Sequence, residues 1–252
     1  MVFATDGRVS ASLRLSVFGR CLDGSEMKDP NRENLRVVAE ALGELREDVV
    51  FLGGAVVGLF ITDNAAPRPR TTKDVDVTVD VAPLSAWQTK LVPRLRDLGF
   101  RETGDAICWW RVGGVLVDVM PADESVFGFS NPWYPEAIAT AEDVMLADDV
   151  SIRVATPTIF LATKMEAFKG RGGGDFMSSH DVEDVIVVVD GRESITTEVG
   201  DAPARVREFV CGTTRDWLSE TDFSYAIEGA VEQGREQIVT ERLREIKDLI
   251  EP

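Results

Sequence analysis

The chain has 252 residues, of which 44% are hydrophobic and 28% are charged, a composition that suits a globular core with room for a small appended domain. Its 27 basic and 44 acidic residues give a formal net charge of -17, so any contact with nucleic acid has to be local, although such charge also serves solubility. Three widely spaced cysteines and one histidine argue against a disulfide framework and a zinc cage. We find no secretory leader and no apolar stretch that could span a bilayer, and we expect a cytoplasmic protein without membrane contact.

Local patterns predict alternating helices and strands up to about residue 192. Asp29-Pro30 and Thr156-Pro157 each combine a helix cap with proline at the first helical position. Gly113-Gly114 separates the arms of a candidate hairpin, and Pro93 should kink its helix. In chain order, we expect a helix over 30–46, a strand at 49–52, a helix over 54–60, a loop at 65–70, a strand over 73–81, a helix over 83–98, a hairpin of 106–112 with 114–120, a structured loop at 124–140, a strand at 151–155, and helices over 157–169 and 179–189.

Beyond residue 192 the sequence shows helical patterns without strand signals, near 202–218, 222–232 and 235–250. The chain therefore reads as an α/β (α+β) protein in three parts. We expect a leader or short extension at 1–28, a catalytic core at 29–192 and a helical C-terminal region at 193–252.

Three aspartates carry the strongest chemical signal. Asp74 and Asp76 lie two residues apart on a predicted strand, so their side chains point to the same face, which by itself usually marks a solvated strand. Three further features favour a functional site. Gly53-Gly54 ends an upstream strand and leaves backbone N–H groups that can cradle phosphates, and a positively charged loop lies between this turn and the aspartates. Asp118 sits inside an apolar strand, where an unpaired carboxylate is costly. Together they predict a three-carboxylate cage for a divalent metal, for which Mg²⁺ is well suited.

Lys164 is the second informative residue. Its helical neighbours at three and four positions are apolar, and a lysine on such a stripe is rarely buried without a partner. It either snorkels over the core or neutralises the phosphates of a nucleotide, and we favour the second interpretation.

Several basic residues surround these motifs. Arg68, Arg70 and Lys73 directly precede the aspartate pair, and Arg171 belongs to a glycine-rich turn at 170–174 that could close on phosphates. The acidic run at 180–184, which contains Asp181 and Asp184, is explained in part by the dipole at a helix start. His180 alone cannot form a metal site, and no nucleophile-elbow motif accompanies it.

Two sets of motifs resemble a known superfamily. Gly53-Gly54, the run from Thr72 to Asp76, and Val117-Asp118-Val119 look like the catalytic motifs of polymerase-β-type nucleotidyltransferases. The later runs 160–168 and 181–186 are similar to the abortive-infection (AbiE-type) toxins of type IV toxin–antitoxin systems and to related uncharacterised bacterial nucleotidyltransferases.

The resemblance implies a mixed sheet flanked by helices and Mg²⁺-dependent transfer of NMP from an NTP, with one or two ions that Mn²⁺ can replace. It implies that Asp74 and Asp76 hold the metal and that Asp118 binds the ion nearer the acceptor and helps to activate its hydroxyl. The implied nucleotide-binding residues are Gly53, Gly54, Arg70, Thr72, Lys73, Lys164 and Arg171, with Asp181 and Asp184 in support. The loop before Asp74 is longer than in many members of the superfamily, which leaves the roles of Arg70 and Lys73 open.

Two functions from different classes remain. The first is an enzyme that nucleotidylates tRNA, a protein or a small molecule, with a cognate antitoxin as a further partner if it is a toxin. The second is a catalytically inactive nucleotide- or partner-binding module. If the acceptor is RNA, we expect the cleft residues Arg68, Arg70, Lys73, Lys169 and Arg171 to grip it, because residues 196–252 are acidic.

Overall fold

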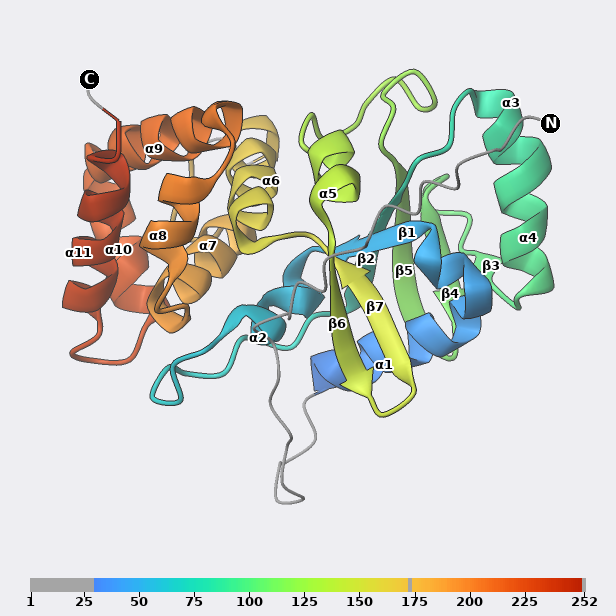
Figure 1. Cartoon of the computed structure of the whole chain (residues 1–252), viewed down its shortest axis with the longest axis horizontal. Helices are drawn as coiled ribbons and strands as arrows, with labels where there is room; N and C mark the ends of the chain where they lie inside the picture. The colour runs from blue at the N-terminus through green and yellow to red at the C-terminus, as the bar shows by residue number, and fades with distance from the viewer. Residues whose placement is uncertain (1–29, 172–173, 251–252) are drawn as a thin grey trace, which may run out of the picture.

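The computed structural model describes residues 30–171 and 174–250, which form a mixed sheet flanked by helices (Figure 1). The expected α/β class is therefore confirmed. The leader predicted at 1–28 and the capping residue Asp29 lie outside the described residues, as do Gly172 and Gly173 of the glycine-rich turn.

The sheet has seven strands in the order β3-β4-β5-β2-β1-β7-β6. Strands β2 and β5 are parallel, as are β1 and β7, and the other neighbours are antiparallel. The strands are β1 (Val49–Leu52), β2 (Asp74–Val79), β3 (Arg101–Glu102), β4 (Trp109–Val112), β5 (Val115–Pro121), β6 (Glu142–Ala147) and β7 (Val150–Val154).

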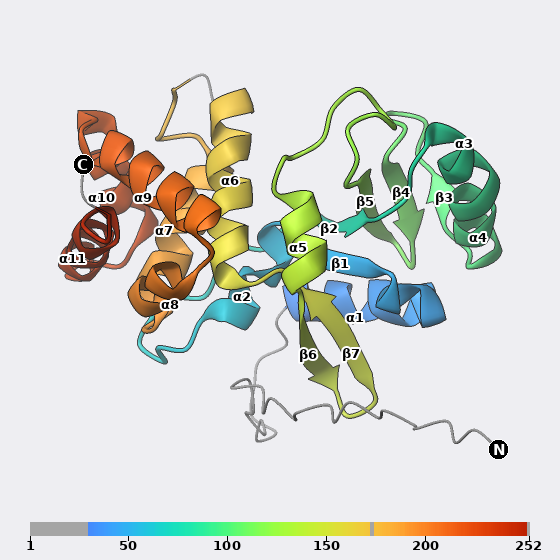
Figure 2. The same cartoon turned by 45° about the horizontal axis from the view of Figure 1, so that its top comes forward.

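The two faces of the sheet differ in chemistry, as the alternating pattern of β2 predicts. Val75, Val77 and Val79 are fully buried on one face, whereas Asp74 and Asp76 point to the other and are only half-buried. Helix α1 (Pro30–Leu42) lies on one side of the sheet and α5 (Tyr134–Thr140) on the other (Figure 2).

The remaining helical elements are short connections near the sheet and a group of longer helices beside it. The short ones are the 3₁₀ turns η1 (Gly43–Glu47) and η2 (Gly54–Val56), α2 (Val57–Phe60), and the run α3 (Leu84–Ala86), η3 (Trp87–Leu91) and α4 (Val92–Asp97). The longer ones are α6 (Pro157–Arg171), α7 (His180–Gly191), α8 (Ile195–Asp201), α9 (Ala204–Leu218), α10 (Thr221–Ala230) and α11 (Glu236–Lys247). None of the helices in the described part of the chain is long and apolar enough to cross a membrane.

Helices α6 to α11 gather at one end of the sheet (Figure 1, left). An aromatic cluster of Phe168, Phe176, Trp217 and Phe223 ties α6 to α9 and α10, with ring centroids 4.7 to 5.7 Å apart. Helices α6 and α7 pack against the later helices, and the division expected at residue 192 stays a prediction. Their position brings the first turns of α7 beside the loop before β2, where Arg70 contacts Glu183 and Asp184.

Four expectations about local structure were wrong or incomplete. The loop expected at 124–140 ends in helix α5, because Pro135 occupies its first turn and Ala137 is buried against the sheet. Strand β6 was missed, and β7 is its hairpin partner rather than an isolated strand. Helix α8 was also missed. At Pro93, where we expected a kink, the π-helical turn η3 ends at Leu91 and α4 begins at Val92, with Pro93 in its first turn.

Candidate functional site

The three aspartates lie on one face of two neighbouring strands. Asp76 on β2 is directly opposite Asp118 on the parallel strand β5, and paired residues of adjacent strands point to the same face. Asp74 lies on the same face of β2, two residues earlier. The structure thus places all three carboxylates that the sequence singled out on the same face of two neighbouring strands.

Gly53 and Gly54 form the turn directly beside these carboxylates. Gly53 follows Leu52, the residue of β1 that is directly opposite Asp76 of β2. The φ angle of Gly53 is positive, at 74°. A Cβ atom at Gly53 would overlap the Asp76 carboxylate, so only glycine lets that carboxylate lie against the backbone. Gly54 is similarly close to Thr72, Arg70 and Asp184.

Gly53→Ala should therefore destabilise the protein by more than its backbone conformation alone explains. With a φ of 74° and a ψ of -170°, Gly53 lies in a backbone region that is essentially restricted to glycine, where a side chain costs about 1–3 kcal/mol, and displacement of the Asp76 carboxylate adds to this. Gly99→Ala is the control for a positive φ alone, because Gly99 has a φ of 86° and open space around its Cβ position. Thermal unfolding should show a larger loss for Gly53→Ala, and equal losses would refute the steric role of Gly53.

Burial makes the charged forms of these carboxylates costly. Burial first, and then the neighbouring Asp74 carboxylate, raise the pKa of Asp76 to about 7. Burial likewise raises the pKa of Asp118, against hydrogen-bonding contacts with the Cys108 thiol and the Trp109 indole. Asp118 Oδ1 is buried and has no hydrogen-bond partner. A cation would offset each of these costs.

The donor set fits a hard divalent cation such as Mg²⁺, since it offers carboxylate oxygens, one of them without a partner, beside an open cleft. Within residues 30–171 and 174–250, however, no group of three or more histidine, cysteine, aspartate or glutamate side chains is placed so that it could hold a metal ion. The three aspartates would therefore hold an ion only together with water or substrate oxygens, which Mg²⁺ commonly keeps among its ligands.

The raised pKa of Asp76 predicts a pH dependence of stability in the metal-free protein. An unfolded aspartate titrates near ~3.9, whereas Asp76 in the folded chain keeps its proton to about pH 7. Between these values only the folded chain holds this proton, so the contribution of Asp76 to the unfolding free energy should fall as pH rises from about 4 to about 7 and then level off.

Thermal unfolding in EDTA measures this effect. Asp76→Asn mimics the protonated side chain and should be more stable than wild type at pH 8, with a smaller difference at pH 5. Asp80→Asn, at an exposed position just after β2, controls for the loss of one carboxylate. A difference between Asp76→Asn and wild type that does not change with pH would contradict the prediction.

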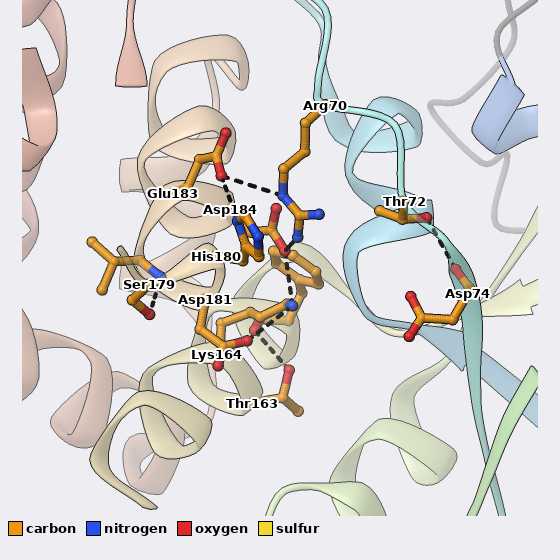
Figure 3. Close-up of polar contacts among 12 residues, drawn as sticks. Arg70, Thr72, Asp74, Thr163, Lys164, Ser179, His180, Asp181, Glu183 and Asp184 are labelled. Carbon is orange, nitrogen blue, oxygen red and sulfur yellow. Dashed lines mark hydrogen bonds and ion pairs between the residues drawn. The ribbon is translucent and has the colours of Figure 1, made fainter. Parts of the chain in front are cut away.

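Lys164 on helix α6 points toward the first turns of the neighbouring helix α7 (Figure 3). Its Nζ atom lies 2.8 Å from Asp184 and 3.1 Å from Asp181, and its side chain is only 12% exposed. Burial opposes its charge, but the carboxylates of Asp184, Asp181 and Asp76 outweigh burial and raise the pKa of Lys164. Lys164 is therefore a charged partner of the carboxylates of α7 rather than a snorkelling lysine.

Arg70 belongs to the same ion-pair network. It lies 3.3 Å from Glu183 and 3.2 Å from Asp184, and Arg171 lies 3.2 Å from Asp181. The acidic residues at the start of α7 thus form ion pairs with the cationic side chains of the cleft. These ion pairs explain the acidic run better than the helix dipole does.

A buried asparagine holds the loop that carries Arg70. Asn31 on α1 donates to the Arg70 carbonyl (2.8 Å) and accepts from the Thr72 backbone N–H (2.9 Å). The Thr72 hydroxyl donates to the Asp74 carbonyl (3.0 Å), so Thr72 connects the loop to the start of β2. Thr72 therefore acts on the site through the backbone.

These residues surround an open cleft of about 870 Å³ between the sheet and α7. Its lining includes Gly54, Arg70, Thr71, Thr72, Lys73, Asp74, Asp76, Lys164, Arg171, Asp175, Ser178, Ser179, His180, Asp181 and Glu183. Asp118 is one strand beyond Asp76 and does not line it. Lys169, which we expected near the cleft, instead lies over the Phe209 ring at 4.2 Å.

Sequence reasoning missed three residues on the Asp118 side. Cys108 and Trp109 are close to Asp118. Burial first, and then the negative charges of Asp76 and Asp118, raise the pKa of Tyr134. Trp109 stands out in the sequence only as one of two adjacent tryptophans, and strand register decides which of them faces the carboxylates.

A scan against protein-family models and a search of curated proteins both gave no match to this chain. Function therefore has to be inferred from the chemistry of the site.

Proposed function

We propose that the chain is a Mg²⁺-dependent nucleotidyltransferase with a polymerase-β-like core, which transfers NMP from an NTP to an acceptor hydroxyl. The observation that carries the proposal is the pairing of Asp76 with Asp118 on parallel strands, with Asp74 on the same face and the glycine turn beside them. This arrangement places acidic oxygens on one side of a cleft that also holds Arg70, Lys164 and Arg171, which suits a metal–triphosphate substrate.

Each residue has a definite role in the proposed reaction. Lys164, with Arg70 and Arg171, balances the charge of the triphosphate, and the backbone N–H groups of the Gly53-Gly54 turn bind its oxygens. The acceptor oxygen bonds to the α-phosphorus while the bond to the bridging oxygen breaks, so that pyrophosphate leaves toward the cations. Asp118 accepts the proton of the acceptor hydroxyl.

Asp74, Asp76 and Asp118 would hold the metal. Bound there, Mg²⁺ supplies charge stabilisation for the attacking and leaving oxygens of an in-line displacement. Asp181 and Asp184 support the site by holding Lys164 in position. A cytoplasmic toxin of AbiE type, controlled by an antitoxin, is the more specific form of the proposal.

One observation favours the second candidate, an inactive nucleotide- or partner-binding module. The cleft cations Lys164, Arg70 and Arg171 are already paired with carboxylates of α7, so a triphosphate must compete for them. Tight ion pairs of this kind are compatible with a purely structural network.

Incubation of the protein with each of four NTPs labelled at the α-phosphate, with Mg²⁺ and either total tRNA or cell extract, distinguishes the two candidates. The enzyme should attach label covalently to an acceptor and release pyrophosphate, and EDTA should prevent both. Saturable NTP binding without transfer would favour the binding module. Absence of both transfer and binding would contradict both candidates.

A further inference from the structure

The face that carries the aspartates continues past Asp118 onto strands β4 and β3. Trp109 is directly opposite Asp118, so Asp76, Asp118 and Trp109 form one row across β2, β5 and β4. At a strand spacing of about 5 Å, the backbone of Trp109 lies one strand from Asp118 and two from Asp76. The next row runs from Asp74 through Leu116 to Arg111 and Arg101.

Trp109 lies on this face, where its indole contacts the Asp118 carboxylate. It is 37% exposed, whereas the adjacent Trp110 points to the opposite face and is completely buried. An exposed indole beside a candidate catalytic carboxylate is a surface on which a planar group can stack.

Arg111 and Arg101 face each other across β4 and β3, and both are exposed. Like charges directly opposite in an antiparallel pair repel each other. Arg111 donates to the Gly114 carbonyl, and neither arginine forms an ion pair with any residue in the described part of the chain. In contrast to the cleft arginines, this pair is available to an external anion.

The direction of the proposed reaction assigns this face to the acceptor. Arg70 and Lys164 lie between Asp74 and α7 (Figure 3), so the leaving pyrophosphate belongs on that side. In an in-line displacement the attacking oxygen enters opposite the leaving group. The acceptor hydroxyl must then approach over β5 and β4, where Trp109 is located.

We infer that Trp109, Arg111 and Arg101 form the acceptor surface of this protein and bind the terminal nucleotides of a single-stranded nucleic acid. The inference rests on the proposed function. The end base stacks on the Trp109 ring beside Asp118, and the two arginines contact backbone phosphates farther from the carboxylates. Arg111 and Arg101 lie on successive strands away from Asp118, an arrangement that suits the successive phosphates of a nucleic acid better than a small molecule. A protein of net charge -17 also needs a local basic patch to bind nucleic acid.

The test is binding of a fluorescent single-stranded RNA with a blocked 3′ hydroxyl, measured by anisotropy without NTP, so that catalysis is not needed. Trp109→Ala should weaken binding by about tenfold, the usual effect of losing one base–aromatic stack. Trp109→Phe keeps a ring and should retain most of the affinity. Arg101→Gln and Arg111→Gln should each weaken binding and reduce its salt dependence.

Matched controls lie on the helices away from this face. Tyr225→Ala removes an exposed aromatic ring from α10, and Arg244→Gln removes an exposed charge from α11, and both should bind RNA as wild type does. Retained NTP affinity in Trp109→Ala would show that the nucleotide cleft is intact.

The outcomes separate this inference from the proposed function. RNA binding that depends on Trp109, in a protein that transfers no NMP, would support the surface and contradict the enzyme. NMP transfer to a protein or small molecule that Trp109→Ala leaves unchanged would overturn the surface alone. Absence of RNA binding by the wild type, or equal binding by all variants, would also overturn it.

Discussion

Asp76→Asn is expected to reduce NMP transfer by about 10³-fold or more, because charge stabilisation at the reacting phosphate is the largest contribution that such a site makes. The substitution keeps the shape of the side chain but removes one of the two facing carboxylates. It should also leave the fold intact, since the neutral amide relieves the cost of a buried charge that the pKa of about 7 reflects. The loss should appear in the α-labelled NTP assay at saturating Mg²⁺.

Asp80→Asn is the control for this experiment, because Asp80 is exposed just after the same strand and does not line the cleft. It should transfer NMP at the wild-type rate. Wild-type activity in Asp76→Asn would show that the three aspartates are not the catalytic set, however well they are arranged.

Lys164→Met should reduce both stability and nucleotide affinity. The Asp184 side chain is 3% exposed and would lose its closest cation. Removal of one partner from a buried pair costs about 3–5 kcal/mol, and we expect about 2–3 kcal/mol here because Arg70 still contacts Asp184. The affinity for NTP should fall as well, since Lys164 lines the cleft.

A double variant separates the two effects. Lys164→Met with Asp184→Asn no longer leaves an unpaired buried carboxylate, so its thermal stability should recover much of the loss. Its affinity for NTP, measured by calorimetry, should stay low. Recovery of both properties would mean that Lys164 acts on the nucleotide only through the fold, and unchanged affinity in Lys164→Met itself would mean that it has no contact with the nucleotide.

The strands and helices with strong local periodicity were predictable from the sequence. The alternation of apolar and polar residues predicted β2, and the Gly113-Gly114 turn predicted the hairpin of β4 and β5. Both signals depend only on residues that are close in the chain. Strand β6 was missed although Val144 and Leu146 alternate with exposed residues, since the hairpin turn at Asp148-Asp149 was not recognised. Helix α5 was obscured by the aromatic and proline residues around its start.

The candidate site was predictable in its residue types but not in its partners. That Asp74 and Asp76 share a face follows from strand geometry, whereas the pairing of Asp76 with Asp118 depends on a crossover that brings β5 beside β2. The ion pairs of Lys164 with Asp181 and Asp184 depend on how α6 packs on α7, which local sequence does not encode. The role of Asn31 in holding the Arg70 loop likewise arises from contacts about forty residues apart.

Binding of Mn²⁺, followed by electron paramagnetic resonance in the presence of a non-hydrolysable NTP, tests most directly whether the aspartates form a metal–nucleotide site. The wild type and Asp80→Asn should bind Mn²⁺ in a way that depends on the nucleotide, and Mg²⁺ should displace it. Asp76→Asn should bind far less Mn²⁺ and so should Asp118→Asn, since both remove a carboxylate from the same row. Equal Mn²⁺ binding by all four proteins would contradict this account, and so would the absence of binding in the wild type.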